Sequence, residues 1–399
     1  MKEKNLLVIT SIYPFKSDHR GIFIKNQIEI LREDFETVFV ISPLAYFPKF
    51  LLKFKLFQSI SGYTQYPNDY SYENIYVFFP RYIPVLFFGS GLLRLKSYLI
   101  TKAVFTILKD KKIKFDIIHA HFTWPSGNIG VKLKKKYQKP VVTTIHENGE
   151  WFDAEVGMNH PLINAAWSEA DALIRVNMKD VPVLKHYNDH VYAIPNGYSP
   201  AFHPIDTIVV REKLGLSANQ KIIFSVGALI KRKGFEYLIE AMEKICSQRK
   251  DIICYIGGVG PERERLLGQI NRLHLKEKVT LLGSVPGDQL TLWMNSCDFF
   301  VLPSLNEGNP TVMFETLGCG KPFVGTKVGG VPEIITSDEY GLLVKPADSE
   351  DLERKILQAL DREWNREAIL RYSEQFTWEN ISKKISAIYQ EIGVHSEWY

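Results

Sequence analysis

The sequence predicts two doubly wound α/β domains that face each other across a cleft. Short apolar runs alternate with amphipathic stretches in two successive sets, as strands and helices do in such domains. The segment between the sets contains Pro195, Gly197, Pro200 and Pro204, which suit a semi-rigid linker. The length of 399 residues and the apolar fraction of 45% allow a substantial core in each domain.

The first set begins with an expected strand at residues 5–11, followed by a loop that ends at Gly21. We expect a helix at residues 22–32 and a second strand at 37–41. A glycine between a first strand and a helix lets a phosphate or a sugar approach the backbone, although a plain turn accounts for Gly21 equally well.

Residues 43–108 are harder to order than the rest of the chain, although a long helical run is expected from Leu92. Three lysines interleave with four phenylalanines there: Lys49, Lys53, Lys55, Phe47, Phe50, Phe54 and Phe57. This pattern fits a segment at an anionic membrane surface or a core-packed helix with solvated lysines. Residues 1–180 hold 24 Lys and Arg against 17 Asp and Glu, whereas residues 181–399 hold 25 against 28. The basic surface therefore belongs to the first half, and because no nucleic-acid motif accompanies it we expect no nucleic-acid partner.

A buried strand is expected at residues 115–121, ending in the sequence HAHFTWPSG. Ligands of parallel sheets bind at the carboxyl ends of the strands. We expect His119 and His121 to alternate faces of the strand, so that only one of them points into the cleft. His121 is nearer the loop than His119. The alternative for His121 is a packed, hydrogen-bonded core histidine. Further strands are expected at 140–145, 172–176 and 191–194, and whether His146 and Glu147 contact an acceptor or only cap a loop stays open.

The second set has expected strands at residues 221–227, 252–257, 279–282, 299–302 and 323–325. Three consecutive cations, Lys231, Arg232 and Lys233, follow the first of these strands. That edge of the sheet is where cations would neutralise a diphosphate, and a solvated loop is the alternative.

Residues 303–333 read as a loop, a helix, a strand and a second glycine loop. Pro310 suits the first residue of the helix, and the free backbone N–H groups of Thr311 and Val312 favour a phosphate. Glu307 and Glu315 would repel that phosphate, so we expect them to bind neutral hydroxyls of a ribose or a hexose. The combination indicates a sugar nucleotide.

The run EGNPTVMFE, followed by GCGKP and VGGVPE, resembles the E-x7-E signature of the retaining glycosyltransferases of family four, which have the GT-B fold. PNGYSPAFHP resembles the interdomain segment of that family, and GVGPE, which contains Gly260, its element near the nucleotide base. The resemblance implies that Glu307 holds the donor sugar, Glu315 the ribose, His121 the sugar from the first domain and Lys233 the phosphate.

One position departs from the family pattern. The motif GRLxxxKG of the family corresponds to GALIKRKG here, so that Ala228 stands where the family commonly has arginine. We expect Lys231 or Arg232 to compensate for the missing charge.

The resemblance implies a division of labour between the domains. We expect residues 1–197 to form the acceptor-side domain and residues 198–377 the nucleotide-sugar-binding domain. A terminal helix at about 378–399 is expected to cross back to the first domain.

We therefore predict a retaining glycosyltransferase that moves a sugar from a nucleotide-diphosphate donor, expected to be a UDP-sugar, to a hydroxyl of a glycan or lipid-linked acceptor in cell-surface glycan synthesis. The predicted catalytic residues are His121, Lys233 and Glu307. The predicted donor-binding residues are Gly21, Lys231, Arg232, Gly260, Asn309, Pro310, Thr311, Val312 and Glu315. Because the chain has no DxD triplet, we expect no metal and no cofactor.

Two functions from other classes stay open. One is a sugar-nucleotide 2-epimerase on the same architecture, which needs no acceptor. The other is a non-catalytic partner that binds a nucleotide sugar or a membrane, a reading that Ala228 permits.

We expect a cytoplasmic protein, peripheral on the inner face of the plasma membrane. The apolar run before Ser11 is too short for a signal peptide, and the apolar stretch Ile83 to Leu93 is too short for a membrane span. The four cysteines form no CxxC motif and fit a reducing compartment.

Overall fold

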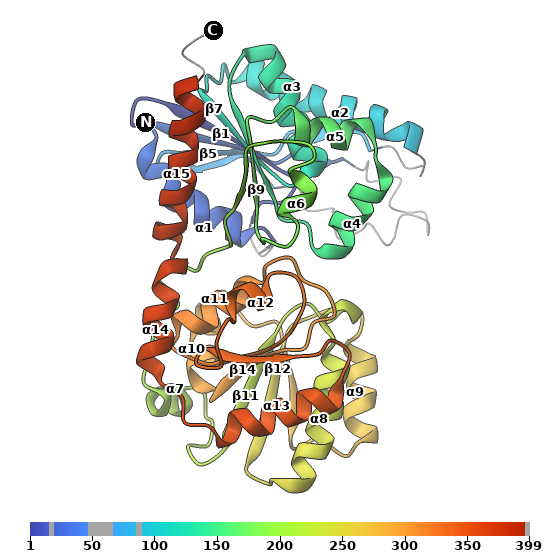
Figure 1. Cartoon of the computed structure of the whole chain (residues 1–399), viewed down its shortest axis with the longest axis vertical. Coiled ribbons are helices and arrows are strands. Elements are labelled where there is room, and N and C mark those ends of the chain that lie inside the picture. Colours follow the sequence, from blue (N-terminus) through green and yellow to red (C-terminus); the bar gives the residue numbers. More distant parts are fainter. Residues whose placement is uncertain (16–19, 47–66, 85–89, 396–399) are drawn as a thin grey trace.

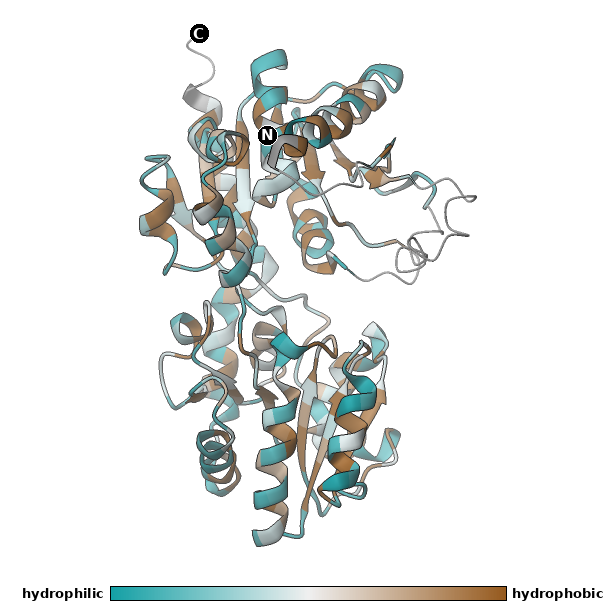
Figure 2. Cartoon of the chain, turned by 90° about the vertical axis from the view of Figure 1, so that its right-hand side faces the viewer, coloured by the Kyte–Doolittle hydropathy of each residue, from teal (hydrophilic) through white to brown (hydrophobic). Residues whose placement is uncertain are grey.

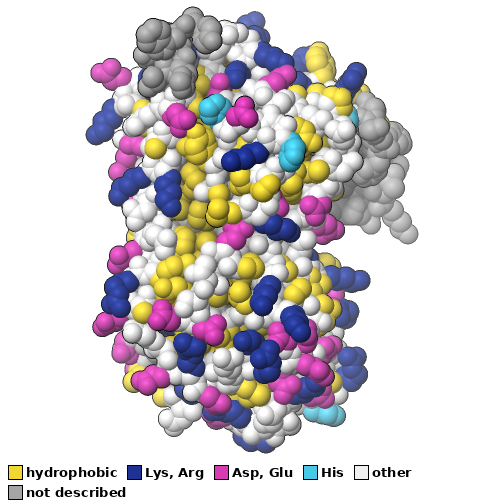
Figure 3. All heavy atoms as spheres, viewed as in Figure 1, with side chains coloured by type: hydrophobic (Ala, Val, Ile, Leu, Met, Phe, Trp, Pro, Cys, Tyr) yellow, Lys and Arg dark blue, Asp and Glu magenta, His cyan; other side chains and the backbone are white. Residues whose placement is uncertain are grey.

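The computed structural model describes residues 1–15, 20–46, 67–84 and 90–395. It shows two α/β domains stacked end to end, each built on its own mostly parallel sheet (Figure 1). The space-filling view narrows where the two domains meet (Figure 3). The predicted fold class is confirmed.

The N-terminal sheet is parallel except at one edge. Its strand order is β10-β9-β8-β7-β1-β2-β5-β4, and only the β4–β5 pair is antiparallel. The strands are β1 (Asn5–Thr10), β2 (Thr37–Ile41), β4 (Tyr70–Tyr72), β5 (Ile75–Phe78), β7 (Ile117–His121), β8 (Val141–Ile145), β9 (Ala172–Arg175) and β10 (Val191–Ala193), with a separate parallel pair β3 (Leu44–Ala45) and β6 (Arg81–Tyr82).

Helices cover both faces of this sheet because its strands are apolar on both sides. They are α1 (Ile22–Leu31), α2 (Ser90–Asp110), α3 (Asn128–Tyr137), α4 (Gly149–Met158), α5 (Pro161–Ser168) and α6 (Val181–Leu184). In β7 and β8 every residue is buried, including the polar ones. The functional side chains of this domain therefore lie at strand ends rather than on an open sheet face.

The C-terminal sheet is wholly parallel, in the order β13-β12-β11-β14-β15-β16. Figure 2 shows its apolar strands enclosed by helices with polar outer faces. The strands are β11 (Lys221–Val226), β12 (Ile252–Gly257), β13 (Val279–Gly283), β14 (Phe299–Leu302), β15 (Phe323–Thr326) and β16 (Gly341–Val344). The helices are α7 (Thr207–Lys213), α8 (Phe235–Gln248), α9 (Arg263–Arg272), α10 (Gly287–Ser296), α11 (Thr311–Gly318), α12 (Val331–Ile334), α13 (Ser349–Asp361) and α14 (Arg366–Ser373).

The chain crosses between the domains twice, and the two crossings lie side by side. The Tyr198 N–H donates to Phe376 O at 3.0 Å, and the Trp378 N–H donates to Tyr198 O at 3.1 Å. After the second crossing, α15 (Trp378–His395) packs on α1 and enters the N-terminal core through residues such as Ile385 and Ile388. The domain limits at 197 and 377 fall in these crossings and stay predictions.

The region that was hard to order contains β3 to β6 and most of α2, which begins two residues before the helical run expected from Leu92. Those four strands are two to four residues long, too short for a periodic signal. The aromatic and basic segment proposed to contact a membrane lies almost entirely within residues 47–66, outside the described residues. Among the described residues, no helix combines the length and apolar character needed to cross a bilayer.

Candidate functional site

The loop between β14 and α11 places Glu307 at the carboxyl edge of the C-terminal sheet, beside the cations predicted for the donor. Lys233 Nζ lies 2.6 Å from Glu307 Oε1, and Arg232 Nη1 lies 3.2 Å from Oε2. The Ser304 hydroxyl also donates to Oε1 at 2.6 Å. The structure thus brings together three residues that the sequence predicted to share one site.

Two cations decide the charge of Glu307. Burial alone would raise the pKa of this carboxyl, but the combined charges of Lys233 and Arg232 outweigh burial and hold the pKa below its ordinary value. Glu307 is therefore an ionised acceptor, and because a carboxylate has more lone pairs than these donors use, it can still accept from a sugar hydroxyl.

Helix α11 begins one residue later than expected, with Pro310 as its N-cap rather than its first residue. Among described residues no side chain caps this helix start, so the N–H groups of Thr311 and Val312 are available to an anion. Glu315 lies one turn inside the helix, where burial raises its pKa to about 8. Since Glu315 is largely neutral at pH 7, it does not oppose an anion at the helix start.

The structure separates the two cations proposed to compensate for Ala228. Residues Lys231–Lys233 form a short 3-10 turn after β11. Lys231 is exposed, whereas Arg232 is 28% exposed and donates to Asn306 O at 2.7 Å as well as contacting Glu307. Arg232 therefore lies inside the site and Lys231 on its edge.

Two predicted glycines occupy tight loops. Gly21 caps α1 with φ of +78°, and a Cβ there would lie 2.8 Å from Ile12 O, so the position requires glycine. Gly260 lies in the loop between β12 and α9, which is tied to the end of β11 by the hydrogen bond from Leu229 N–H to Val259 O. The Gly260 loop thus borders the cationic turn.

His121 lies in a row of buried imidazoles. Its Nδ1 is 2.9 Å from His146 Nε2, and its Nε2 has no partner among the described residues. The ring of His119 stacks on it with centroids 4.3 Å apart. The expectation that His119 and His121 alternate faces of the strand was wrong, because residues two apart on a strand point to the same face.

Burial lowers the pKa of His121 and of His146 well below the ordinary value, with further lowering by neighbouring charges. Both imidazoles are therefore neutral near pH 7. His119 is fully committed, since Nδ1 contacts the Tyr389 hydroxyl at 2.5 Å and Nε2 contacts the Thr144 hydroxyl at 2.7 Å. The unpartnered Nε2 of His121 is itself buried, so a ligand hydroxyl can exchange a hydrogen bond with it only when the surrounding loops move.

Two carboxyl groups lie beside this row, that of Glu147 buried and that of Glu155 partly buried. Glu147 Oε1 accepts from the Thr123 N–H at 2.7 Å, and its Oε2 has no partner among the described residues. Burial and the charge of Glu147 raise the pKa of Glu155 to about 9. The nearby buried Arg175 is already bound to Asp180. The N-terminal side of the site is thus buried and polar, and most of its ionisable groups are neutral.

The two sides of the site touch through the backbone. Gly308 packs against the carbonyls of His146 and Glu147, where a Cβ would come within 3.2 Å of both oxygens. Asn196 N–H donates to Asn309 Oδ1 at 2.8 Å, and the Asn196 amide donates to Asn309 O at 2.7 Å. The Asn309 amide nitrogen is left buried without a partner among described residues.

A second contact across the cleft comes from Glu333 in α12. Its carboxylate accepts from the backbone N–H groups of Met178 at 2.6 Å and Lys179 at 2.9 Å. Sequence reasoning assigned no role to Glu333, Asn196 or Tyr389. The segments PNG and GGVPE drew attention to two of them, but only the tertiary arrangement shows their partners.

Among the residues that the structure describes, no three or more His, Cys, Asp or Glu side chains lie close enough together to bind one metal ion. The four cysteines are free and buried. Cations and backbone N–H groups lie at the start of α11, and groups of this kind can stabilise developing negative charge.

Two family models together match most of the chain. Residues 63–202 match the model described as Glycosyltransferase Family 4, and residues 206–376 match Glycosyl transferases group 1. A glycosyltransferase of Methanocaldococcus jannaschii is 30% identical over 296 residues, covering 69% of this chain and 75% of that protein. A Bacillus subtilis protein described as a glycosyltransferase of teichuronic acid biosynthesis is 29% identical over 388 residues, covering 94% of this chain and 90% of that protein.

Solved structures share the architecture over nearly the whole chain. Sucrose-phosphate synthase from Thermosynechococcus elongatus matches with a TM-score of 0.77 and 19% identity, covering 98% of this chain and all of that one. Anabaena HepE, solved in complex with UDP, matches with a TM-score of 0.73 and 20% identity, covering 97% of this chain and all of that one. At these identities the likeness concerns the fold.

Proposed function

This chain belongs to the glycosyltransferases, with a family four domain followed by a group 1 domain, and from that premise we propose a retaining enzyme that moves a sugar from a UDP-sugar to a hydroxyl of a lipid-linked glycan. The observation that carries the proposal is the group formed by Glu307, Lys233 and Arg232 at the start of α11. A carboxylate for sugar hydroxyls lies there beside cations and free N–H groups for a diphosphate.

In the proposed complex the diphosphate takes over the donors that Glu307 now holds. Lys233 and Arg232 move from the carboxylate to the phosphate oxygens, while Thr311 and Val312 donate their N–H groups. Glu307 then accepts from hydroxyls of the sugar, and Glu315 from those of the ribose. Each well-placed donor contributes on the order of 3 kcal/mol at the transition state.

The acceptor enters between the two domains, where the N-terminal side offers a neutral His121. The acceptor oxygen forms its bond to the anomeric carbon on the face from which the diphosphate departs, so the configuration is retained. The acceptor proton passes to the departing phosphate oxygen, and the products are the glycoside and UDP. The contacts of Gly308 and Glu333 with the N-terminal domain exclude water during this step.

The proposed donor and acceptor agree with the properties of similar proteins. HepE was solved with UDP and with UDP-glucose, and the Bacillus relative that spans most of the chain is described for teichuronic acid, a polysaccharide. A polysaccharide acceptor built on a lipid requires access to a membrane, and we propose peripheral association with its anionic inner face. Metal independence belongs to the same proposal.

Thermal unfolding in the presence of UDP-, GDP-, ADP- and dTDP-sugars, with and without EDTA, tests the donor. The expected result is a rise in Tm with the UDP-sugar alone that survives EDTA, because only the native state binds the ligand. A rise that EDTA abolishes would contradict metal independence. The absence of any shift at millimolar ligand would contradict the donor site itself.

Product analysis then tests the reaction. NMR of the anomeric proton distinguishes retention from inversion, and inversion would overturn the proposed mechanism. A sugar-nucleotide 2-epimerase would instead release an epimerised sugar nucleotide without any acceptor. A non-catalytic partner would bind the donor and yield neither product.

A further inference from the structure

The segment from α2 to the end of α3 is the most basic part of the chain. Residues 90–139 contain twelve Lys and Arg but only two Asp and Glu. The two helices lie side by side in the N-terminal domain, at the end of the molecule away from the C-terminal domain (Figure 1). A concentration of one sign of charge on one part of a surface attracts partners of the opposite charge.

Some of these cations are neutralised within the fold and others are not. Lys134, Lys135 and Lys139 form ion pairs with Asp171, Glu169 and Asp116, respectively. Lys102, Lys109 and Lys136 are exposed, and none of them forms an ion pair with the described residues. Arg94, Lys111, Lys112 and Lys114 are exposed as well and form no ion pair with the described residues, so unneutralised charge extends along α2 and into the loop that follows it. Lys102, Lys109 and Lys136 are the part of this charge that lies on α2 and the neighbouring end of α3.

Apolar side chains accompany these three lysines. Leu95 and Tyr98 on α2 are 45% and 59% exposed, and their spacing from Lys102 places all three on one helix face. The ammonium of Lys136 lies 4.2 Å from the ring centroid of Phe105, which joins α3 to the same face. We call Leu95, Tyr98, Lys102, Lys109 and Lys136 the α2–α3 face.

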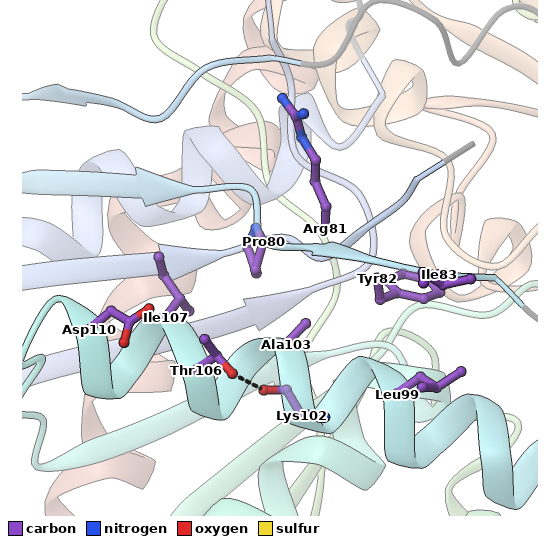
Figure 4. A pocket seen from close by; sticks show the side chains of 10 residues that line it. All are labelled: Pro80, Arg81, Tyr82, Ile83, Leu99, Lys102, Ala103, Thr106, Ile107 and Asp110. Atoms are coloured by element: carbon purple, nitrogen blue, oxygen red, sulfur yellow. Dashed lines mark hydrogen bonds between the residues drawn. The ribbon is translucent and has the colours of Figure 1, made fainter. Parts of the chain in front are cut away.

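Two hollows flank α2 on this face, and Lys102 lines both. One, of about 420 Å³, lies between α2 and β6 and is lined mainly by apolar groups such as Tyr82, Ile83 and Leu99 (Figure 4). The other, of about 390 Å³, lies between α2 and α3 and is lined by Tyr98 and Phe105 as well as lysines. Asp110 contributes the single carboxylate among their lining residues.

We propose that the α2–α3 face docks on an anionic phospholipid bilayer. Cations that border exposed apolar groups match such a surface, since the lysines meet headgroup phosphates while Leu95 and Tyr98 enter the interface. A polyanionic glycan would use the charges but leave the apolar side chains without a role. Docking at this end leaves the cleft and the C-terminal domain in water, free to bind the donor.

This inference rests on the proposed lipid-linked acceptor and places the enzyme where that acceptor resides. It is independent of the residues 47–66, since every member of the α2–α3 face is described. The contact is predicted to be salt-sensitive, because exposed charges are screened at high ionic strength.

Vesicle flotation tests the proposal with the full-length protein. Vesicles of phosphatidylglycerol and phosphatidylcholine in equal parts are compared with vesicles of phosphatidylcholine alone, at low and at high salt. We expect binding to the anionic vesicles at low salt, and a loss of most of it at high salt or without phosphatidylglycerol. Failure to bind anionic vesicles at low salt would overturn the proposal.

Lysine substitutions test whether the α2–α3 face is the surface that binds the vesicles. Replacing Lys102, Lys109 and Lys136 together by Gln should weaken vesicle binding at least about tenfold. The matched control replaces three exposed lysines elsewhere, Lys213→Gln, Lys276→Gln and Lys383→Gln, which removes the same charge and should change binding less than about twofold. Equal losses in both triple variants would refute a localised face.

Two further experiments distinguish a bilayer from an anionic glycan as the partner, and membrane docking from catalysis. Leu95→Ser with Tyr98→Ser should weaken vesicle binding while leaving binding to dextran sulfate unchanged; an unchanged vesicle affinity would instead assign the face to an anionic glycan. UDP release from the UDP-sugar by hydrolysis in solution should be the same in the triple variant and the wild type. If the wild type binds vesicles but releases no UDP, the proposed function fails and the docking face stands.

Discussion

The two sides of the cleft bury ionisable side chains at the carboxyl edge of a parallel sheet, yet they differ in charge. On the C-terminal side, Lys233 and Arg232 keep Glu307 ionised. On the N-terminal side, burial keeps His121 neutral and Glu155 protonated, because the one buried arginine nearby is committed to Asp180. The availability of a counter-ion, rather than burial itself, decides which side can neutralise a diphosphate.

The strongest test of this contrast removes the charged carboxylate. Glu307→Ala should lower kcat at least about a hundredfold, because the hydroxyls of the donor sugar lose the carboxylate that orients them in the transition state. Steady-state transfer from the UDP-sugar measures the effect. Glu243→Ala, at an exposed glutamate of α8, is the matched control and should retain normal turnover. Near-normal transfer by Glu307→Ala would remove this residue from the site.

The second test concerns Arg232, the cation proposed to compensate for Ala228. Arg232→Met should raise the KM for the donor on the order of tenfold to a hundredfold, the range for hydrogen bonds to charged groups. Lys231→Met should change the KM little, because Lys231 is exposed at the edge of the site. Adding Ala228→Arg to Arg232→Met should restore much of the loss. If Lys231→Met has the larger effect, the assignment of Arg232 is wrong.

A smaller effect is expected on the neutral side. His121→Ala should lower kcat/KM by about tenfold, the value of one hydrogen bond between neutral groups. Because His121 is held neutral, the pH profile of the wild type should show no histidine ionisation near pH 6.5. A bell-shaped profile with a limb near that pH, abolished in His121→Gln, would show that the imidazole changes its charge during turnover.

The smallest expected effects are on stability, and replacing a glutamate by glutamine should change stability in opposite directions on the two sides. The pKa of Glu155 is raised from 4.5 to about 9, so its contribution to stability is full below pH 4.5 and is lost as the pH rises toward 9. The pKa of Glu307 is lowered, so its contribution is present above the ordinary value and is lost in acid. The Tm of Glu155→Gln should therefore exceed that of the wild type by a few degrees at about pH 8 but not at about pH 4. The Tm of Glu307→Gln should fall below that of the wild type, and by more at neutral pH than in acid. Equal offsets at both pH values would contradict these charge states.

The parts of the site that depend on local order were predictable from the sequence. Strands, the cationic turn and the start of α11 follow from apolar runs, glycines and Pro310, and the family motifs mark Glu307 and Lys233. The role of each predicted residue stays a prediction, because no bound ligand tests it.

What the sequence could not show depends on tertiary contacts. The choice between Lys231 and Arg232 requires the path of the loop around Asn306. The bonds of Glu333 to Met178 join residues 155 positions apart, and no local pattern encodes such a pair. The wrong orientation expected for His119 relative to His121 does not come from missing tertiary information. The two-residue period of a strand already places residues two apart on one face.

The paired crossings at Tyr198 and Thr377 determine how the cleft can open. A single covalent tether would let one domain spin about the tether axis. Two chain crossings joined by backbone hydrogen bonds oppose rotation of one domain about the other, but they still allow bending. Twisting one domain against the other would break these bonds, so we expect the domains to open by bending at the two crossings, which would return Gly308 to the same place on closure.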